Sequence, residues 1–399
     1  MTVLAAGVVL VAAPGVAHAD TVRGLSWHLD SLKIGQAHAI SQGEGVVVAV
    51  IDSGVDAGHP DLQGQVLPGF GIGGDAAADG RADVVGHGTR MAGLIVGKGG
   101  GDQHVLGVAP RAKILPVSLG SSYPGGEIAD AIRGAVDRGA SVINVSLGGG
   151  TAAATSEETA AVAYAISKDV VVVAAAGNLE QGARAVASPA RIPGVVAVAA
   201  SSQDGSAWSG SVQGAELAVA APGVRIVSTD PQTVTRSGYA VSDGTSGAAA
   251  IVSGEAALIR SKFKQLSAAN VINRIIRTAK DAGNPGRDDL YGFGVIDPVA
   301  ALTADVPEVS SNPLIAGGTG ASPVATGTGK PPLVAVHIDW KVMGPLLAVV
   351  AVAFAGGAVW LVLAGRRRRR AHQPPVGSHP YGPGYPPPPG YGPPRPPGH

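Results

Sequence analysis

Short apolar runs recur along the middle of the chain and are separated by amphipathic stretches. Five runs are almost free of polar side chains, at residues 46–51, 113–117, 142–146, 170–175 and 195–199. Strands of this kind are buried on both faces, as in a parallel sheet covered by helices. Between two of the runs, residues 127–138 repeat apolar side chains at helical spacing. The alternation of strand and helix predicts an α/β fold with a mainly parallel central sheet.

Two further apolar segments lie near the ends of the chain. Residues 1–19 close on Ala17-His18-Ala19, a small-x-small pattern that is typical of signal-peptide cleavage sites. The usual basic residue before the apolar stretch is missing, so the true start, at Met1 or upstream of it, stays open. We expect the part of the chain that follows to be exported.

The second apolar segment, residues 344–364, carries no charge and is long enough to cross a hydrocarbon core of about 30 Å. Trp340 and Lys341 flank one end, and five arginines, Arg366 to Arg370, follow the other. A buried core helix is the alternative, but these flanks favour a membrane helix over residues 341–365 with the arginines in the cytoplasm. The sequence therefore predicts a single-pass protein of the cell membrane whose main domain is extracytoplasmic.

The remaining boundaries follow from composition. We expect an N-terminal extension at residues 20–44, a globular domain at 45–303, and a linker rich in Pro, Gly, Ser and Thr at 304–340. The tail, residues 366–399, is basic and then rich in Pro, Gly and Tyr. Two interpretations of the tail stay open: a solvated segment without a partner, and a segment in polyproline II conformation that binds one.

Charge and cysteine content narrow the classes of function. The 399 residues carry 29 basic and 29 acidic side chains, so nothing indicates a nucleic-acid partner. There is no cysteine, which excludes disulfides, a thiol nucleophile and cysteine zinc sites. The aspartates between 75 and 83 match no metal-loop spacing, so we expect neither a metal nor a cofactor.

Two motifs place reactive side chains at element ends. Asp52 ends the first apolar run, and the carboxyl end of a parallel strand is where open α/β sheets place their sites, although aspartate there is also an ordinary turn former. His87 lies between Gly86 and Gly88 at the expected start of a helix, where a surface turn is the alternative.

A third motif, Gly244-Thr245-Ser246, precedes a run of small apolar residues, so Ser246 is a candidate helix cap as well as a candidate nucleophile. The chain order Asp, His, Ser is the order of the subtilisin triad. The blocks at 52–62, 87–89 and 244–246 resemble the catalytic blocks of the subtilase family, and the block at 174–178 resembles the segment of that family that ends in an oxyanion-hole asparagine.

The resemblance implies a three-layer subtilisin-like fold and a role for each of these residues. Asp52 would orient His87, and His87 would act as the general base for Ser246. Asn178 and the backbone N–H of Ser246 would stabilise the oxyanion. We expect Ser246 to cap its helix as well. His38, His59 and His104 belong to no such motif, and we interpret them as structural or surface residues.

Residues 145–149 resemble the edge of the subtilase cleft that pairs with an extended peptide substrate. This predicts substrate contacts at Ser146, Leu147, Gly148 and Gly149, with Ala175 and Gly177 in the neighbouring pocket wall. An ordinary strand that ends in a glycine turn is the alternative. Two departures from the family pattern are Ala250, where a proline is usual, and Gly247 directly after the serine.

The order of signal peptide, catalytic domain, linker, single membrane helix and basic end resembles the mycosins. These are membrane-anchored subtilases of type VII secretion systems, although many of them contain cysteines. Residues 20–44 are too few for the folding prodomain of secreted subtilases. Three roles stay open: an endopeptidase acting within a type VII membrane complex, a structural stabiliser of that complex, and a surface protease of degradative function.

Overall fold

In the computed structural model, residues 21–121, 127–147 and 153–316 are described. The elements follow one another in the order α1 (Val22–Leu25), α2 (Trp27–Ser31), α3 (Ile34–His38), β1 (Val47–Asp52), β2 (Phe70–Gly71), α4 (His87–Val96), β3 (Lys113–Ser118), α5 (Glu127–Asp137), β4 (Val142–Val145), α6 (Ser156–Ser167), β5 (Val171–Ala175), the 3-10 turn η1 (Leu179–Gln181), β6 (Val196–Ser201), β7 (Val219–Pro222), β8 (Ile226–Thr229), β9 (Tyr239–Ser242), α7 (Thr245–Lys262), α8 (Ala268–Thr278), α9 (Pro298–Thr303) and α10 (Pro313–Ala316).

Seven strands form one parallel sheet in the order β2-β3-β1-β4-β5-β6-β7. Each of the five apolar runs forms one of its strands, so the expected α/β fold with a mainly parallel sheet is confirmed. In β1, Val48 pairs with Ile114 of β3 on one side and with Val142 of β4 on the other. The separate strands β8 and β9 form an antiparallel hairpin.

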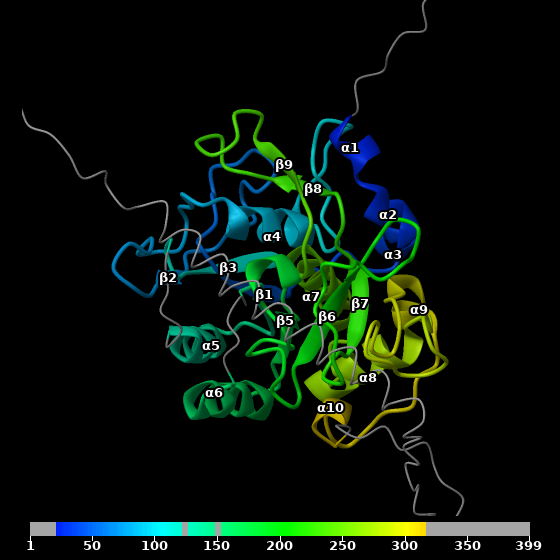
Figure 1. The fold of residues 1–399 in the computed structure, drawn as a ribbon. Coiled ribbons are helices and arrows are strands. Elements are labelled where there is room, and N and C mark those ends of the chain that lie inside the picture. Colours follow the sequence, from blue (N-terminus) through cyan, green and yellow to red (C-terminus); the bar gives the residue numbers. More distant parts are fainter. Residues whose placement is uncertain (1–20, 122–126, 148–152, 317–399) are drawn as a thin grey trace, which may run out of the picture. The chain divides into compact units, whose positions relative to one another are not determined.

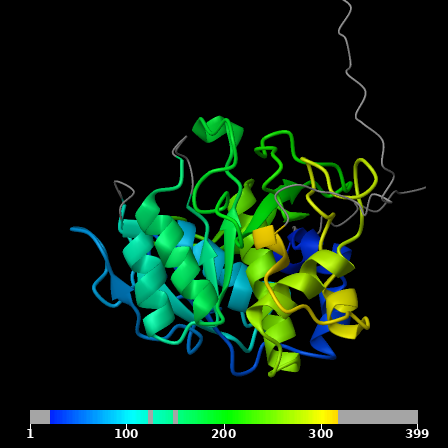
Figure 2. The ribbon, with the colours of Figure 1, turned by 90° about the horizontal axis from the view of Figure 1, so that it is seen from below.

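Helices cover both faces of the sheet. Helices α5 and α6 lie together on one face, and α4, α7 and α8 lie on the other, as the two views show (Figures 1 and 2). The strands serve both layers: Val48 and Val50 belong to the core under α4 and α7, whereas Ala49 and Ile51 belong to the core under α5. Because both faces are buried, these strands have no polar alternation.

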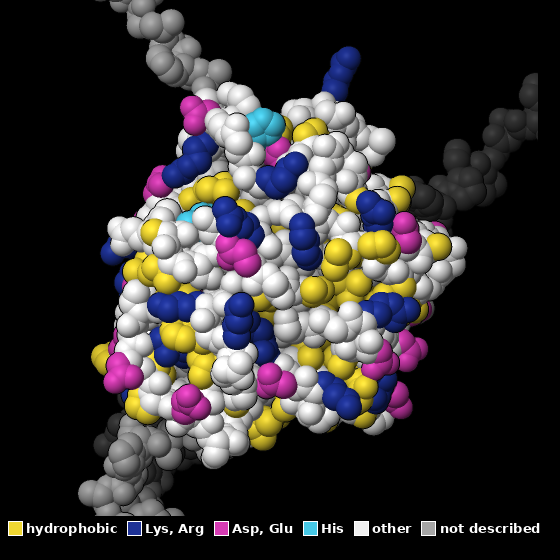
Figure 3. Space-filling model, turned by 180° about the vertical axis from the view of Figure 1, so that it is seen from behind, with side chains coloured by type: hydrophobic (Ala, Val, Ile, Leu, Met, Phe, Trp, Pro, Cys, Tyr) yellow, Lys and Arg dark blue, Asp and Glu magenta, His cyan; other side chains and the backbone are white. Residues whose placement is uncertain are grey.

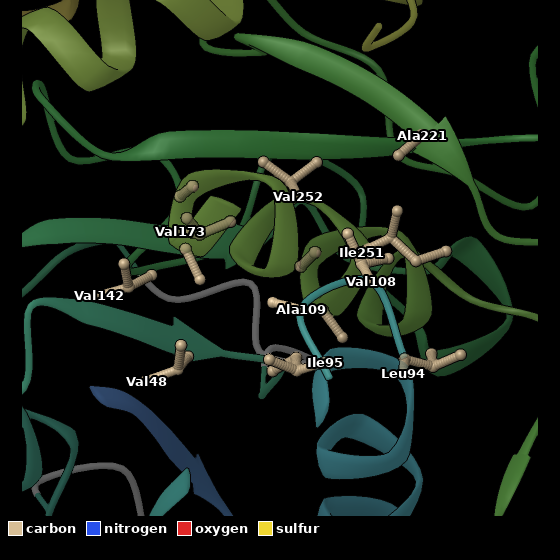
Figure 4. Packing of buried hydrophobic residues seen from close by; sticks show 14 of the residues in the cluster. Val48, Leu94, Ile95, Val108, Ala109, Val142, Val173, Ala221, Ile251 and Val252 are labelled. Atoms are coloured by element: carbon tan, nitrogen blue, oxygen red, sulfur yellow. The ribbon is translucent and has the colours of Figure 1, made fainter. Parts of the chain in front are cut away.

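Helix α7 is buried along most of its length. Every residue from Ala248 to Ile259 is buried, and many are alanine or glycine, which allows the helix to approach its neighbours closely. Ile251 and Val252 of α7 pack in one cluster with strand residues such as Val173 and with Ile95 at the end of α4 (Figure 4). The nucleophile candidate therefore lies at the start of a helix that is held on all sides.

The folded part extends beyond both expected boundaries. In the N-terminal extension, Trp27 Nε1 donates to Val224 O (3.1 Å) and Ser41 Oγ donates to Leu258 O (2.9 Å). In the expected linker, the side chain of Asn270 exchanges hydrogen bonds with the backbone of Val309 (2.7 and 3.2 Å). These side-chain bonds to backbone satisfy polar groups that composition alone assigns to solvent.

The expected signal peptide and membrane span lie outside the described residues. Within the part that is described, no helix is both long and apolar enough to cross a membrane.

On the face opposite to that of Figure 1, Lys and Arg side chains are spread out with Asp and Glu between them (Figure 3).

Candidate active site

Asp52 and His87 meet at the carboxyl end of β1. Asp52 is the last residue of β1 and is 1% exposed, and His87 is the first residue of α4. His87 Nδ1 lies 2.8 Å from Asp52 Oδ1 and 2.9 Å from Oδ2. Because a carboxylate only accepts, Nδ1 carries the proton and Nε2 is left to accept one. Gly88 is required here, since a Cβ would lie 2.1 Å from the carbonyl oxygen of Gly54.

Asp83 fixes the start of α4 relative to the loop after β1. This buried carboxylate accepts hydrogen bonds on both oxygens, from Ser53 Oγ (2.9 Å), Val85 N (3.0 Å) and Gly86 N (2.8 Å) on Oδ1 and from Thr89 N (3.0 Å) and Thr89 Oγ1 (2.7 Å) on Oδ2. It satisfies donors that the first turn of a helix leaves free. The motif search missed Asp83, although an acidic residue just before a helix is a known start signal.

The pKa of His87 lies above its ordinary value. Burial alone would lower this pKa, but the charge of Asp52 and its hydrogen bond raise it by more, while the nearby charge of Arg90 lowers it. The imidazolium is therefore stabilised where general-base catalysis would create it.

Ser246 is the second residue of α7 and is 9% exposed. The expectation that it caps the helix is wrong: the N-cap is Gly244, and no side chain caps this end. The Ser246 hydroxyl instead donates to Ser146 O (3.0 Å). In the described part of the chain no hydrogen bond joins His87 to Ser246, so catalysis requires this hydroxyl to turn toward Nε2 of His87, as catalytic hydrogen bonds often do when substrate binds.

A buried chain of hydrogen bonds lies beneath Ser246. Ser253 Oγ donates to Asn144 Oδ1 (3.0 Å), Asn144 Nδ2 donates to Ser146 Oγ (2.8 Å), and Ser146 Oγ donates to Ser246 O (3.2 Å). Asn144 and Ser253 are fully buried. The chain ties β4 to the first turns of α7 and sets the position of the Ser246 backbone.

The amide of Asn178 has a fixed orientation. Its Oδ1 accepts from Thr245 N (3.0 Å) and Thr245 Oγ1 (2.9 Å). Because both partners are donors, the oxygen must face them, and Nδ2 points away as a donor. Gly177 N donates to Thr245 Oγ1 (3.2 Å), which holds that hydroxyl in place. Asn178 is thus bonded to the residue directly before Ser246, as an oxyanion-hole donor would be.

A cleft of about 370 Å³ brings Asp52, His87 and Ser246 together, and Asn178 is not among its lining residues. It is lined by Asp52, Ser53, Val85, His87, Arg90, Gly120, Ser121, Ser146, Leu147, Gln181 and Ser246. Of the expected substrate residues, Ser146 and Leu147 line it, Ala175 and Gly177 do not, and Gly148 and Gly149 lie outside the described residues. None of the lining residues comes from the described extension at 21–44.

His38, His59 and His104, which belong to no catalytic motif, have backbone or carboxylate partners. His38 Nε2 lies 2.8 Å from Val108 O, and His59 Nε2 donates to Gly238 O (2.8 Å) while its Nδ1 accepts from a backbone N–H. His104 Nδ1 lies 2.5 Å from Asp61 Oδ1. In the ranges that the structure describes, no group of three or more His, Asp or Glu side chains is arranged to hold a metal ion.

Comparison with known proteins identifies the family. The profile of the Subtilase family matches residues 43–294. The chain belongs to the subtilase family. This subtilase is 38% identical over 283 residues to Subtilisin Savinase of Lederbergia lenta, covering 70% of this chain and 99% of the relative. It is 32% identical over 400 residues to Mycosin-1 of Mycolicibacterium smegmatis, covering 86% and 85%. It is thus a serine protease of the subtilisin type, and it resembles the mycosins.

Solved structures agree with this assignment. The crystal structure of MycP1 with its N-terminal propeptide removed superposes with a TM-score of 0.62 at 33% identity, covering 71% of this subtilase and 98% of MycP1. The MycP3 protease of the type VII (ESX-3) secretion system gives the same TM-score and identity, covering 73% and 90%. The three-layer subtilisin-like fold is therefore confirmed.

Proposed function

We propose that this subtilase is a membrane-anchored extracytoplasmic endopeptidase with Asp52, His87 and Ser246 as its triad. The hydrogen bond between His87 Nδ1 and Asp52, in the same cleft as Ser246, carries the proposal. His87 Nε2 takes the proton of Ser246 Oγ as that oxygen attacks the carbonyl carbon of the peptide bond. Asn178 Nδ2 and the backbone N–H of Ser246 stabilise the oxygen that becomes negative.

The tetrahedral intermediate collapses when its C–N bond breaks. His87 returns its proton to the leaving amine, and the acyl group stays on Ser246 Oγ. Water then attacks the acyl-enzyme with His87 again as the base, which releases the new carboxylate and restores the Ser246 hydroxyl. Asp52 keeps the imidazole in the required tautomer through both steps.

A fluorophosphonate probe tests the assembled nucleophile. The full-length chain, purified in mild detergent, should be labelled, and Ser246→Ala and His87→Ala should abolish labelling. Ser206→Ala, which removes an exposed hydroxyl that donates to Asp204, is the matched control and should label as the wild type does. A folded wild-type chain that fails to react, or a Ser246→Ala chain that still reacts, would refute the proposed triad.

The membrane arrangement rests on the apolar segment 344–364 and its basic flank. Because the chain has no cysteine, an introduced cysteine is the only thiol of this protein that can react with a maleimide. In intact cells, a membrane-impermeant maleimide should label Ser206→Cys, whereas Ser378→Cys should be labelled only after the membrane is permeabilised. Labelling of both in intact cells would exclude the proposed orientation.

We propose further that the protein works with a type VII membrane complex, as the similarity to Mycosin-1 and MycP3 suggests. Co-purification with components of such a complex should distinguish this role from that of a general surface protease. Secretion that persists with the Ser246→Ala chain and fails without the protein would assign the chain a structural role in the complex.

A further inference from the structure

Arg90 presents a positive charge in the catalytic cleft. It lies three residues after His87 on α4, so both side chains extend from the same face of that helix. Both line the cleft, and Asp52 is the only other charged residue among its described lining. Asp52 is buried and bonded to His87, so Arg90 is the charge that remains available to a bound peptide.

Asp230 holds Arg90 in place from the neighbouring hairpin. Arg90 Nη1 donates to Asp230 Oδ1 at 2.7 Å, and Asp230 is 0% exposed. Its Oδ2 has no hydrogen-bond partner in the described chain, so the ion pair with Arg90 is what compensates the burial of this carboxylate. Gly86 leaves room for the pair, because a Cβ there would lie 2.3 Å from Asp230 Oδ1.

The backbone around this ion pair is also fixed. Ser228 Oγ donates to Arg90 O (2.6 Å) and Thr229 Oγ1 donates to Thr89 O (2.7 Å), which ties β8 to α4. The guanidinium is therefore positioned by elements distant in sequence and is not a freely moving surface side chain.

Most of the hydrogen-bonding capacity of Arg90 is unused. A guanidinium has five N–H donors, and one of them bonds to Asp230. The Arg90 side chain is 19% exposed. Its Nε and Nη2 are not among the buried atoms that lack a hydrogen-bond partner. In the described chain the other four donors of this fixed, charged group have no hydrogen-bond partner, and such a fork suits a carboxylate.

We infer that Arg90 is a specificity-determining residue that binds an acidic side chain of the substrate on the leaving-group side of the scissile bond. The inference rests on the proposed peptidase function. Gly120 and Ser121 follow β3, Ser146 and Leu147 follow β4, and all four line the cleft. Ser146 and Leu147 belong to the edge expected to hold the acyl half of the peptide. Arg90 is tied to β8 and to Asp230 directly after it, and β8 and β9 lie on the other side of α4 from β3 and β1 (Figure 1).

The test compares matched peptides. A peptide that the full-length wild-type enzyme cleaves is identified by mass spectrometry and remade with Glu, Gln or Lys at each of the two positions after the cut. At about 50 mM salt we expect Glu to exceed Gln in kcat/KM by on the order of tenfold at one of these positions. This ratio should fall several-fold at about 1 M salt, because salt screens a partly exposed charge.

Variants assign the preference to Arg90. Arg90→Gln should bring the Glu to Gln ratio to about one, and Arg90→Glu should favour the Lys peptide. Arg111→Gln, which removes a charge from an exposed ion pair with Glu44 outside the cleft, should keep the wild-type ratio. If Arg90→Gln does not fold, the wild-type enzyme still tests the inference. A Glu to Gln ratio near one, or a ratio that does not fall at about 1 M salt, overturns it.

The outcomes separate this inference from the function on which it rests. Equal turnover of the Glu and Gln peptides at both positions overturns the role of Arg90 and leaves the peptidase proposal intact. A wild-type ratio that persists unchanged in Arg90→Gln overturns it as well. A chain that cleaves no peptide and does not react with the fluorophosphonate removes the peptidase proposal and this inference with it.

Discussion

Glu255 is a carboxylic acid inside the buried helix α7, and removing it should stabilise the protein in a way that depends on pH. The residue is 0% exposed, and neither carboxyl oxygen has a hydrogen-bond partner in the described chain. Burial raises the pKa of Glu255 well above its ordinary value, and the negative charge of Asp297 raises it further. The folded chain therefore holds this proton more tightly than the unfolded chain does.

The sign and size of the effect follow from linkage. Below about pH 4.5 both states are protonated, and Glu255 does not make stability depend on pH. Above that pH the unfolded chain ionises and the folded chain does not, so the free energy of unfolding falls by roughly 1.4 kcal/mol per pH unit until the raised folded pKa is reached. In a domain of this size this corresponds to roughly 2 °C in Tm per pH unit.

Glu255→Gln removes the titration and keeps the shape, and Glu255→Met also removes the buried polar atoms. Thermal unfolding between pH 5 and pH 8 should show that the Tm advantage of Glu255→Gln over the wild type grows with pH. Glu255→Met should raise the free energy of unfolding by about 1–3 kcal/mol more than Glu255→Gln does at every pH, because it leaves no unpartnered polar group buried. The exposed Glu180→Gln is the control and should show no such trend. An advantage that is flat across this range would refute the reasoning.

Three further predictions concern the catalytic cleft. Asn178→Ala should lower kcat by about 100- to 1,000-fold with a smaller effect on KM, measured by peptide hydrolysis, because one oxyanion donor is lost; a loss below threefold would contradict this role. Asp83→Asn should destabilise the fold by about 2–4 kcal/mol in denaturant unfolding and also lower kcat/KM, because an amide nitrogen would face donors that now bond to the carboxylate; wild-type stability would contradict it. Since the pKa of His87 is raised and the base must be neutral, kcat/KM should rise with pH through a midpoint above about 6.5. Asp52→Asn should lower this midpoint along with a loss of about 10,000-fold in kcat, and a wild-type midpoint below about pH 6 would exclude the raised pKa.

The local sequence determined the elements and the reactive residue types. Continuous apolar runs predicted the strands because strands buried on both faces need apolar residues at every position, and β1 and β3–β6 form where those runs lie. The Asp52, His87 and Ser246 blocks were recognisable because each lies at the end of a strand or the start of a helix, where a short motif fixes the local backbone.

The tertiary structure alone decided which distant groups meet. The order β3-β1-β4 aligns the ends of three strands, and this alignment brings Asp52, Ser121 and Ser146 into one cleft. Arg90 and Asp230 are 140 positions apart, and no local pattern relates two charges at that separation.

Three details escaped the sequence because they depend on packing. Gly244 is the N-cap of α7 where Ser246 was expected, and Ser246 Oγ donates to the carbonyl oxygen of Ser146, directly after β4, and not to its own helix. The residues at 21–44 and 305–316 pack on the domain through bonds between side chain and backbone, since Ser41 Oγ donates to Leu258 O and Val309 N donates to Asn270 Oδ1. Periodicity reports the neighbours of a residue within its element, whereas these contacts join elements that only the folded chain brings together.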